Sequence, residues 1–250
     1  MHCDPPYYDW LSDVSTSGFS LVRLLNPQPG EQVLDVSCRT GELTAAIADQ
    51  GSVAKGVCGD PGKIDKARSS YPHAEFEVSN AYELAADNPY DAVFCYAALH
   101  WLPRPEDALA SVHGVLRPGG RFVAEMGAAG NWTALIDGLR QAADAVGLPR
   151  HVPLPWHFPT AAEQAALLES AGFRVRMLEC LDRSTPMVDC PRGAEDWWRT
   201  VGSPVLAAYP SEHVDELLVK ATDFTRATLM GSDGTWHADG TRLRFVAEAV

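Results

Sequence analysis

The sequence predicts an α/β fold built around a parallel, doubly wound sheet. Short apolar runs of strand length alternate with segments in which apolar residues recur every three or four positions. The clearest case is Gln32–Val36, a strand pattern followed by a tight loop that closes at Gly41 and by a helix pattern from Leu43 onward. Strands that alternate with helices favour a parallel sheet covered on both faces. Ligands of such sheets bind at the carboxyl ends of the strands, so we look for a site there.

Length and composition are those of one globular unit. A chain of 250 residues can bury one sizeable core with a helical subdomain. The net charge of −13 disfavours a nucleic-acid backbone or an anionic membrane as partner, and no apolar stretch reaches the roughly 18 residues of a membrane span. No secretory leader opens the chain, and the six cysteines lack metal-ligand spacing. We therefore expect a cytoplasmic protein with reduced thiols and no metal site.

The first 25 residues combine an aromatic cluster with an amphipathic helix. Tyr7, Tyr8 and Trp10 form the cluster, and apolar residues at helical spacing follow over Phe19–Leu25. The prolines within residues 26–30 end this helix, since proline cannot continue it.

Three more strands are expected in the first half of the chain. Val53–Val57 is short and apolar, and Ala74–Val78 alternates apolar with polar residues. A helix over Lys63–Ser70 separates these two strands. A longer apolar strand begins at Asp91 and runs into the segment Ala97–Trp101.

The second half continues the alternation of helices and strands. Pro105 is placed to open a helix, because proline is favoured in the first turn. The remaining expected elements are a strand over 121–125, a helix over 130–146, a helix from the capping box Thr160-Ala-Ala-Glu163 to Gly172, a strand over 173–181, helices within 192–230 and a strand over 242–250.

The loop after the first strand carries a resemblance to a known family. Asp35-Val-Ser37-Cys-Arg39-Thr-Gly41 resembles the D-x-G-x-G-x-G loop of class I S-adenosylmethionine (SAM) dependent methyltransferases. Glycines in that loop let the backbone approach the cofactor and adopt positive φ. Only the last glycine is present here, because Ser37 and Arg39 stand at the other two positions.

Two later segments strengthen the resemblance. Ala97–Trp101 and the turn Leu116–Phe122 are similar to the end of strand 4 and the turn before strand 5 in methyltransferases related to the trans-aconitate methylating enzymes. The resemblance implies a Rossmann-like sheet of seven strands, the last one antiparallel, with a helical insert over the active site. The implied division of the single domain is a lid helix (1–25), a SAM-binding core (26–181), a helical cap insert (182–235) and a final strand (236–250).

The resemblance also implies where SAM, or its demethylated product S-adenosylhomocysteine (SAH), would bind. The family has an acid for the ribose at the tip of strand 2, where this chain has Cys58; Asp60 either replaces that acid or caps the next helix. Asn80 stands where the family acid accepts from the adenine amino group, and it either keeps that role or is a turn residue. The expected cofactor-binding residues are Asp35, Ser37, Arg39, Gly41, Cys58, Asp60, Asn80, Ala81 and Cys95.

His100 is the catalytic candidate. It follows strand 4, where acceptor and methyl group would meet, and it could be a general base, a hydrogen-bond donor or part of a structural wall with Trp101. Arg183 could pair with a carboxylate substrate or be a surface residue. The expected substrate-binding residues are Tyr8, Trp101, Asn131, Trp156, Arg183 and Trp198, with Glu125 and His157 as further pocket candidates.

The sequence leaves three functions open. The first is methyl transfer from SAM to a small-molecule acceptor, in which the protein mainly supplies proximity. The second is a non-methylating reaction on the same fold, a cyclisation or elimination with SAM or SAH as a bound element. Its support is the changed site positions Ser37, Arg39, Cys58 and Asn80. The third is a non-enzymatic partner of another methyltransferase. No pattern indicates the acceptor or the oligomeric state.

Overall fold

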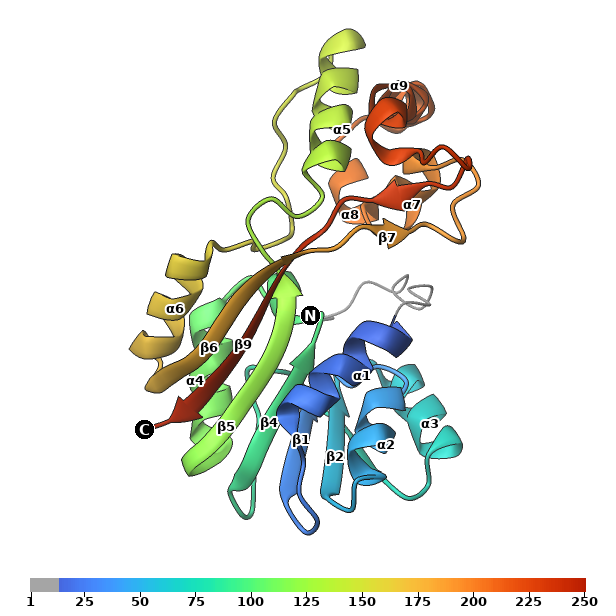
Figure 1. Ribbon diagram of the computed structural model, residues 1–250. Coiled ribbons are helices and arrows are strands. Elements are labelled where there is room, and N and C mark those ends of the chain that lie inside the picture. The colour runs from blue at the N-terminus through green and yellow to red at the C-terminus, as the bar shows by residue number, and fades with distance from the viewer. Residues whose placement is uncertain (1–13) are drawn as a thin grey trace.

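One seven-stranded sheet organises residues 14–250, the part of the chain that the computed structural model describes (Figure 1). Its strands, in spatial order, are β3 (Glu75–Val78), β2 (Val53–Cys58), β1 (Gln32–Val36), β4 (Tyr90–Tyr96), β5 (Leu116–Gly127), β9 (Thr241–Ala249) and β6 (Phe173–Asp182). Neighbouring strands pair in parallel except at β9, which runs antiparallel to both β5 and β6. The doubly wound, Rossmann-like sheet with an antiparallel last strand is therefore confirmed.

Helices cover both faces of this sheet. One face packs on α4 and α6 through buried residues such as Leu109 and Leu168, and the other packs on α1 and α2 through Leu21 and Ile47. The helices are α1 (Val14–Leu25), α2 (Glu42–Ala48), α3 (Pro61–Ser70), α4 (Pro105–Val115), α5 (Thr133–Ala145), α6 (Ala161–Ser170), α7 (Ala194–Thr200), α8 (Ser203–Leu206) and α9 (Ser211–Leu229). The capping box is confirmed: Thr160 Oγ1 accepts from Glu163 N, and the Glu163 carboxylate accepts from Thr160 N at 2.8 Å.

The N-terminal helix α1 lies on the sheet. Leu21, Val22 and Leu25 are buried against Phe94 of β4 and Val123 of β5. The described part of this helix thus has an apolar docking face, as its amphipathic pattern predicts. The aromatic residues expected before it, including the substrate candidate Tyr8, lie outside the described residues.

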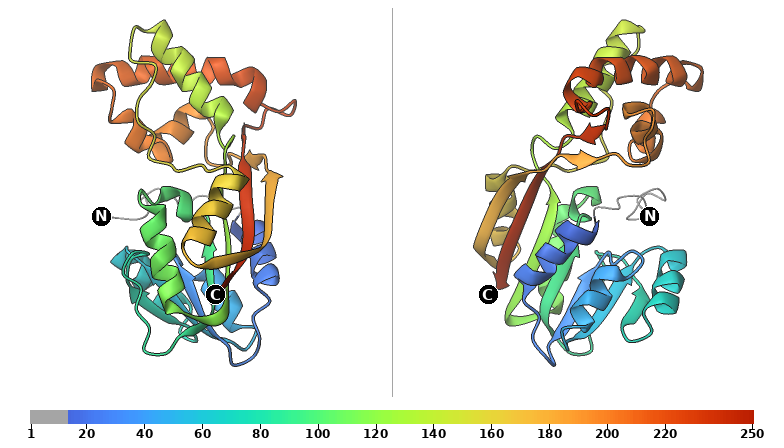
Figure 2. Two further views of the ribbon diagram at one scale, coloured as in Figure 1. Left: turned by 90° about the vertical axis from the view of Figure 1, so that its left-hand side faces the viewer. Right: turned by 45° about the vertical axis from the view of Figure 1, so that its right-hand side comes forward.

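A helical cap stands over the carboxyl ends of the parallel strands (Figures 1 and 2). It consists of α5, α7, α8 and α9 with a short ribbon of β7 (Thr185–Pro186) and β8 (His237–Ala238), and it has a hydrophobic core of its own. Residues 133–145 were expected to belong to the SAM-binding core (26–181). In the structure their apolar stripe packs on α9 instead. A helical pattern shows that one face is buried, but not which element covers it.

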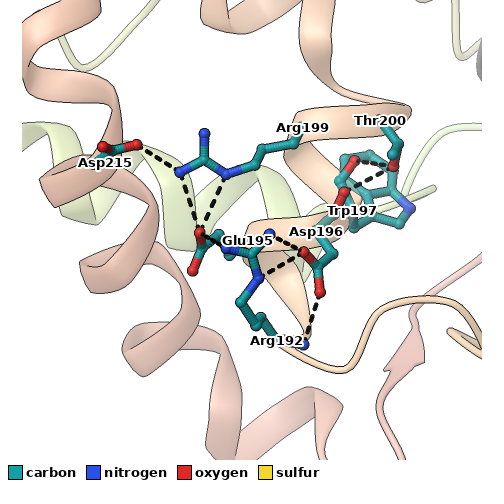
Figure 3. A network of polar contacts seen from close by, with 7 residues as sticks. All are labelled: Arg192, Glu195, Asp196, Trp197, Arg199, Thr200 and Asp215. Carbon is teal, nitrogen blue, oxygen red and sulfur yellow. Dashed lines mark hydrogen bonds and ion pairs between the residues drawn. The ribbon is translucent and has the colours of Figure 1, made fainter.

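An ion-pair network lies on the outside of the cap and connects α7 to α9 (Figure 3). Arg199 Nη2 lies 2.6 Å from Asp215 Oδ1 on α9 and 3.1 Å from Glu195 on its own helix. Arg192 extends the network to Glu195 and Asp196. Among the described residues, no helix combines the length and the apolarity required to cross a bilayer.

Candidate functional site

The loop after β1 keeps a glycine-type backbone without most of the glycines. Ser37, Arg39 and Gly41 have φ values of 65°, 55° and 92°. Left-handed backbone costs a residue with a Cβ roughly 1–2 kcal/mol, so two of these three positions are strained. Strain of this kind persists only where the surrounding structure enforces it, and it concentrates at functional sites. The loop therefore has a backbone that glycine adopts without strain, at two positions where this chain has serine and arginine.

Asp35 lies beneath this loop and is almost completely buried. Its Oδ2 accepts a hydrogen bond from Thr44 Oγ1 at 2.6 Å. Burial raises the pKa of this carboxyl from its ordinary value to about 7, although the bond from Thr44 opposes the shift. A buried carboxylate in this state gains stability from any cation placed near it.

The residues at the tip of β2 have structural roles. Cys58 is buried, and Asp60 is the N-cap of α3, where its Oδ1 accepts from Gly62 N at 2.8 Å and from Lys63 N at 3.3 Å. The capping alternative for Asp60 is thus the one observed. A ribose contact by this residue would have to use Oδ2.

Asn80 also has a local structural task. Its Oδ1 accepts from Tyr82 N at 2.8 Å, and its Nδ2 donates to Glu83 at the same distance. This is the turn role that the sequence left open, and any adenine contact would use the second lone pair of Oδ1. Ala81 and Cys95 are buried in the main core.

His100 lies in a 3-10 turn (Leu99–Trp101) that follows β4, and it is 2% exposed. Its Nδ1 accepts from Gly127 N at 3.2 Å, so the proton of the neutral ring is on Nε2. Burial, with a smaller contribution from the Arg242 charge, holds the pKa of His100 well below its usual range. The ring is therefore a neutral hydrogen-bond donor. Because Nδ1 is occupied, the geometry favours the hydrogen-bond-donor alternative for His100 over the general-base alternative.

Glu125, on β5, is clamped by two arginines. Its carboxylate, 1% exposed, accepts from Arg183 Nη1 at 2.5 Å and from Arg244 Nη2 at 2.7 Å. Ser20 of α1 in turn accepts from Arg244 Nη2 at 2.8 Å. The partly buried Arg183 is therefore not the surface residue that the sequence left open, and its partner in the structure is a carboxylate of the protein. It neutralises a buried carboxylate of the protein.

Asn131 and Arg242 lie beside this ion-pair cluster. Asn131, which is 1% exposed, accepts at Oδ1 from Thr241 N at 3.1 Å and from the Arg242 guanidinium. The guanidinium carbon of Arg242 also lies 5.8 Å from the ring centre of Trp132. Asn131 was expected from the sequence to be near the substrate, whereas Arg242 was not.

Three residues of this region were missed by sequence reasoning: Tyr96, Arg242 and Arg244. Burial, reinforced by the Glu125 charge, raises the pKa of Tyr96 to about 12. The alternation of Arg242 and Arg244 on the final strand was a usable signal, because residues two apart share one face of a strand. Pairing that strand antiparallel to β5 places Arg244 directly opposite Glu125.

Aromatic side chains form the wall between the sheet edge and the cap. Trp132 packs edge-to-face on Trp156, Phe158 and Trp197, with ring centres 4.9 to 5.5 Å apart. Trp198 is completely buried against Trp197, so helix packing describes its position better than the expected substrate contact. Trp101 continues the wall towards His100 at a ring distance of 5.7 Å. The aromatic wall thus lies next to the polar cluster.

Comparisons with known proteins agree with this architecture. Residues 34–124 match the model of the methyltransferase domain family. An uncharacterized methyltransferase of Schizosaccharomyces pombe, C70.08c, is 30% identical over 91% of this chain and 90% of its own length. Trans-aconitate 2-methyltransferase of Deinococcus radiodurans is 32% identical over half of each chain. The crystal structure of the [4+2]-cyclase SpnF has the same fold, with a TM-score of 0.56 at 17% identity over 92% of this chain and 80% of the cyclase.

Proposed function

We propose, since this chain belongs to the class I SAM-dependent methyltransferase family, that it methylates a small-molecule acceptor held between the sheet edge and the cap. The observation that carries the proposal is the left-handed backbone at Ser37, Arg39 and Gly41, the conformation that the glycines of the family loop permit. The net charge of −13 supports a small acceptor over a nucleic acid.

The residues of the loop fit the cofactor that the family uses. When bound, SAM supplies an activated methyl group on a sulfonium. The loop backbone between Ser37 and Gly41 would pass along its methionine part, and the buried Asp35 carboxylate would sit near its positive charge. Asp60 and Asn80 would contact the nucleoside through the oxygen and the lone pair that helix α3 and the turn leave available. Fewer side-chain contacts to the ribose are expected than in family members with an acid at the tip of β2.

The residues near the acceptor would act by positioning. His100 would donate through Nε2 to an acceptor atom of the substrate, and the aromatic wall would exclude water from the reacting atoms. Because His100 is neutral and its Nδ1 is occupied, it would not remove a proton. The methyl-accepting atom is therefore expected to be nucleophilic without deprotonation by this residue.

Mass spectrometry of the small molecules released from the denatured protein, together with calorimetry, tests cofactor binding. We expect SAM or SAH to be retained, and SAH to bind the purified chain with one site. Methyl-labelled SAM then tests the reaction with candidate acceptors, where label in the product is the expected result. No binding of either SAM or SAH would refute the proposal.

A second function, a non-methylating reaction on the same fold, is favoured by one observation. Ser37 and Arg39 place side chains at two loop positions where the family pattern has glycine, and glycine leaves room for the cofactor there. The cyclase SpnF has this fold, although the likeness concerns the fold alone. Conversion of an acceptor without transfer of label would select this second function.

A further inference from the structure

Two buried hydrogen-bond donors near the carboxyl end of β5 have no acceptor. They are Nε2 of His100 and Nδ2 of Asn131, and neither has a hydrogen-bond partner within the described chain. Both are donors because the other polar atom of each side chain accepts a hydrogen bond. Nδ1 of His100 accepts from Gly127 N, and Oδ1 of Asn131 accepts from Thr241 N. An unsatisfied buried donor costs about 1–3 kcal/mol, so a ligand that accepts from both donors would be stabilised by them.

His100, Asn131 and Arg242 are all neighbours of one residue, Gly127. Gly127 N donates to His100 Nδ1, and a Cβ added to Gly127 would lie 3.0 Å from Asn131 Nδ2. Gly127 is also the register partner of Arg242 across the β5–β9 pair. The Arg242 guanidinium donates to Asn131 Oδ1, which fixes this arginine next to the two unsatisfied donors.

Arg242 differs from the two neighbouring arginines in its partners. Arg183 and Arg244 pair with the Glu125 carboxylate, whereas Arg242 donates to the amide oxygen of Asn131. Within residues 14–250, no carboxylate lies at ion-pair distance from Arg242. The nearby acid Asp239 is engaged by the first turn of α5, where it accepts from Ala134 N at 2.8 Å. The Arg242 charge is therefore available to an anionic ligand.

We propose that His100, Asn131 and Arg242 form a subsite for an oxyanion, a carboxylate or a phosphate, carried by the acceptor. That the ligand is the methyl acceptor rests on the proposed function, whereas the site itself does not. A group with several acceptor oxygens and no proton satisfies both unsatisfied donors and the cation at once. Trp132 and Phe158, whose ring centres lie 6.1 and 5.7 Å from that of His100, flank the subsite, so the anion is attached to an apolar or planar body.

Direct binding of simple anions tests the subsite. The full chain is titrated with benzoate, phenyl phosphate and the neutral isostere benzamide, with and without SAH, by calorimetry and tryptophan fluorescence. We expect at least one anion to bind about tenfold or more tightly than benzamide, because benzamide lacks the charge. The tighter anion identifies the group as carboxylate or phosphate. Equal binding of benzamide and both anions, or no anion binding, would overturn the proposal.

Substitutions assign the binding to these residues. Arg242→Gln should weaken anion binding about tenfold or more, whereas Arg176→Gln should leave it unchanged, since Arg176 is an exposed arginine of the same sheet paired with Glu248. Asn131→Asp provides a second variant: it keeps the oxygen that Thr241 and Arg242 need but adds a negative charge, so anion binding should be lost. Anion affinity within twofold of the parent in both correctly folded variants would refute the assignment.

The two proposals fail separately. SAH binding measured in the same titrations reports on the cofactor site, and we expect it to stay within about threefold of the parent in Arg242→Gln. Anion binding that depends on Arg242 in a chain that binds no SAH would leave the subsite intact and remove the methyltransferase proposal. The reverse pattern would remove only the subsite.

Discussion

The two halves of the site are built in different ways. On the side of β1, the defining feature is a left-handed backbone at Ser37 and Arg39, although neither residue is glycine. On the side of β5 and β9, the features are specific side chains: Glu125 with its two arginines, and the donors of His100 and Asn131. Backbone recognition tolerates substitution, whereas a buried polar cluster does not. This difference explains how the β1 loop can depart from the family pattern, whereas the side chains of the cluster on β5 and β9 depend on one another.

The largest effect should come from breaking the cluster on β5 and β9. Glu125→Gln leaves Arg183 and Arg244 partly buried without their counter-charge, and we expect the free energy of unfolding to fall by about 3–5 kcal/mol. Urea denaturation measures this change. The matched control is Glu248→Gln, whose pair with Arg176 is exposed, for which about 0–1 kcal/mol is expected. Equal losses in the two variants would contradict the contrast.

Asp35 is the buried acid of the half of the site on the β1 side. Its contribution to the free energy of unfolding should vary with pH. Because the folded pKa is raised from 3.8 to about 7, the folded state binds more protons between these values. Stability from this group is thus full below pH 4 and lost as pH rises through 7, in total up to about 4 kcal/mol. Asp35→Asn should flatten that slope in denaturation curves of the cofactor-free protein and weaken SAH binding.

The exposed loop residue Asp87 provides the control for this measurement. Asp87→Asn should retain the parent dependence of stability on pH. An unchanged slope in Asp35→Asn would show that the Asp35 carboxyl titrates at its ordinary value. The dependence of stability on pH would then not come from this residue.

Arg39 tests whether backbone conformation carries recognition in the loop. Arg39→Gly should be about 1 kcal/mol more stable than Arg39→Ala, because both lose the same side chain and only glycine relieves the left-handed strain. Thermal unfolding of the pair measures the difference. The affinity of Arg39→Gly for SAH should stay within about threefold of the parent, whereas a loss beyond about tenfold would place recognition in the guanidinium.

The smallest effect is expected on the outside of the cap. Arg199→Met removes the exposed pair with Asp215, and the cap is held mainly by its apolar core, so the loss should not exceed about 1 kcal/mol. Raising the salt concentration should diminish the difference between variant and parent, because exposed charges are screened. A loss that is larger and independent of salt would mean that the network in Figure 3 contributes as a buried cluster does.

Local patterns predicted the elements and their order. Gln32–Val36, the loop closing at Gly41 and the capping box at Thr160 are encoded within a few residues, and each is found where it was expected. The destination of α5 was not predictable in this way, because its apolar stripe is satisfied by α9, some 80 residues later in the chain.

The site was predictable only where its parts are local. The turn roles of Asn80 and Asp60 were available from spacing, whereas the tautomer of His100 depends on Gly127 N, 27 residues away. The pairing of Glu125 with Arg244 joins residues 119 apart and follows from strand pairing, not from any motif.

The position of β9 in the sheet sets the order in which the protein can be completed during translation. This strand lies between β5 and β6 but is synthesised after every other strand of the sheet. A nascent chain can form β1 and its loop early, while Glu125 waits for Arg244 and Asn131 for Arg242 until the ribosome has passed them. Until then, β5 and β6 leave open edges and Glu125 an uncompensated charge, which makes this interval the one most exposed to aggregation or chaperone capture.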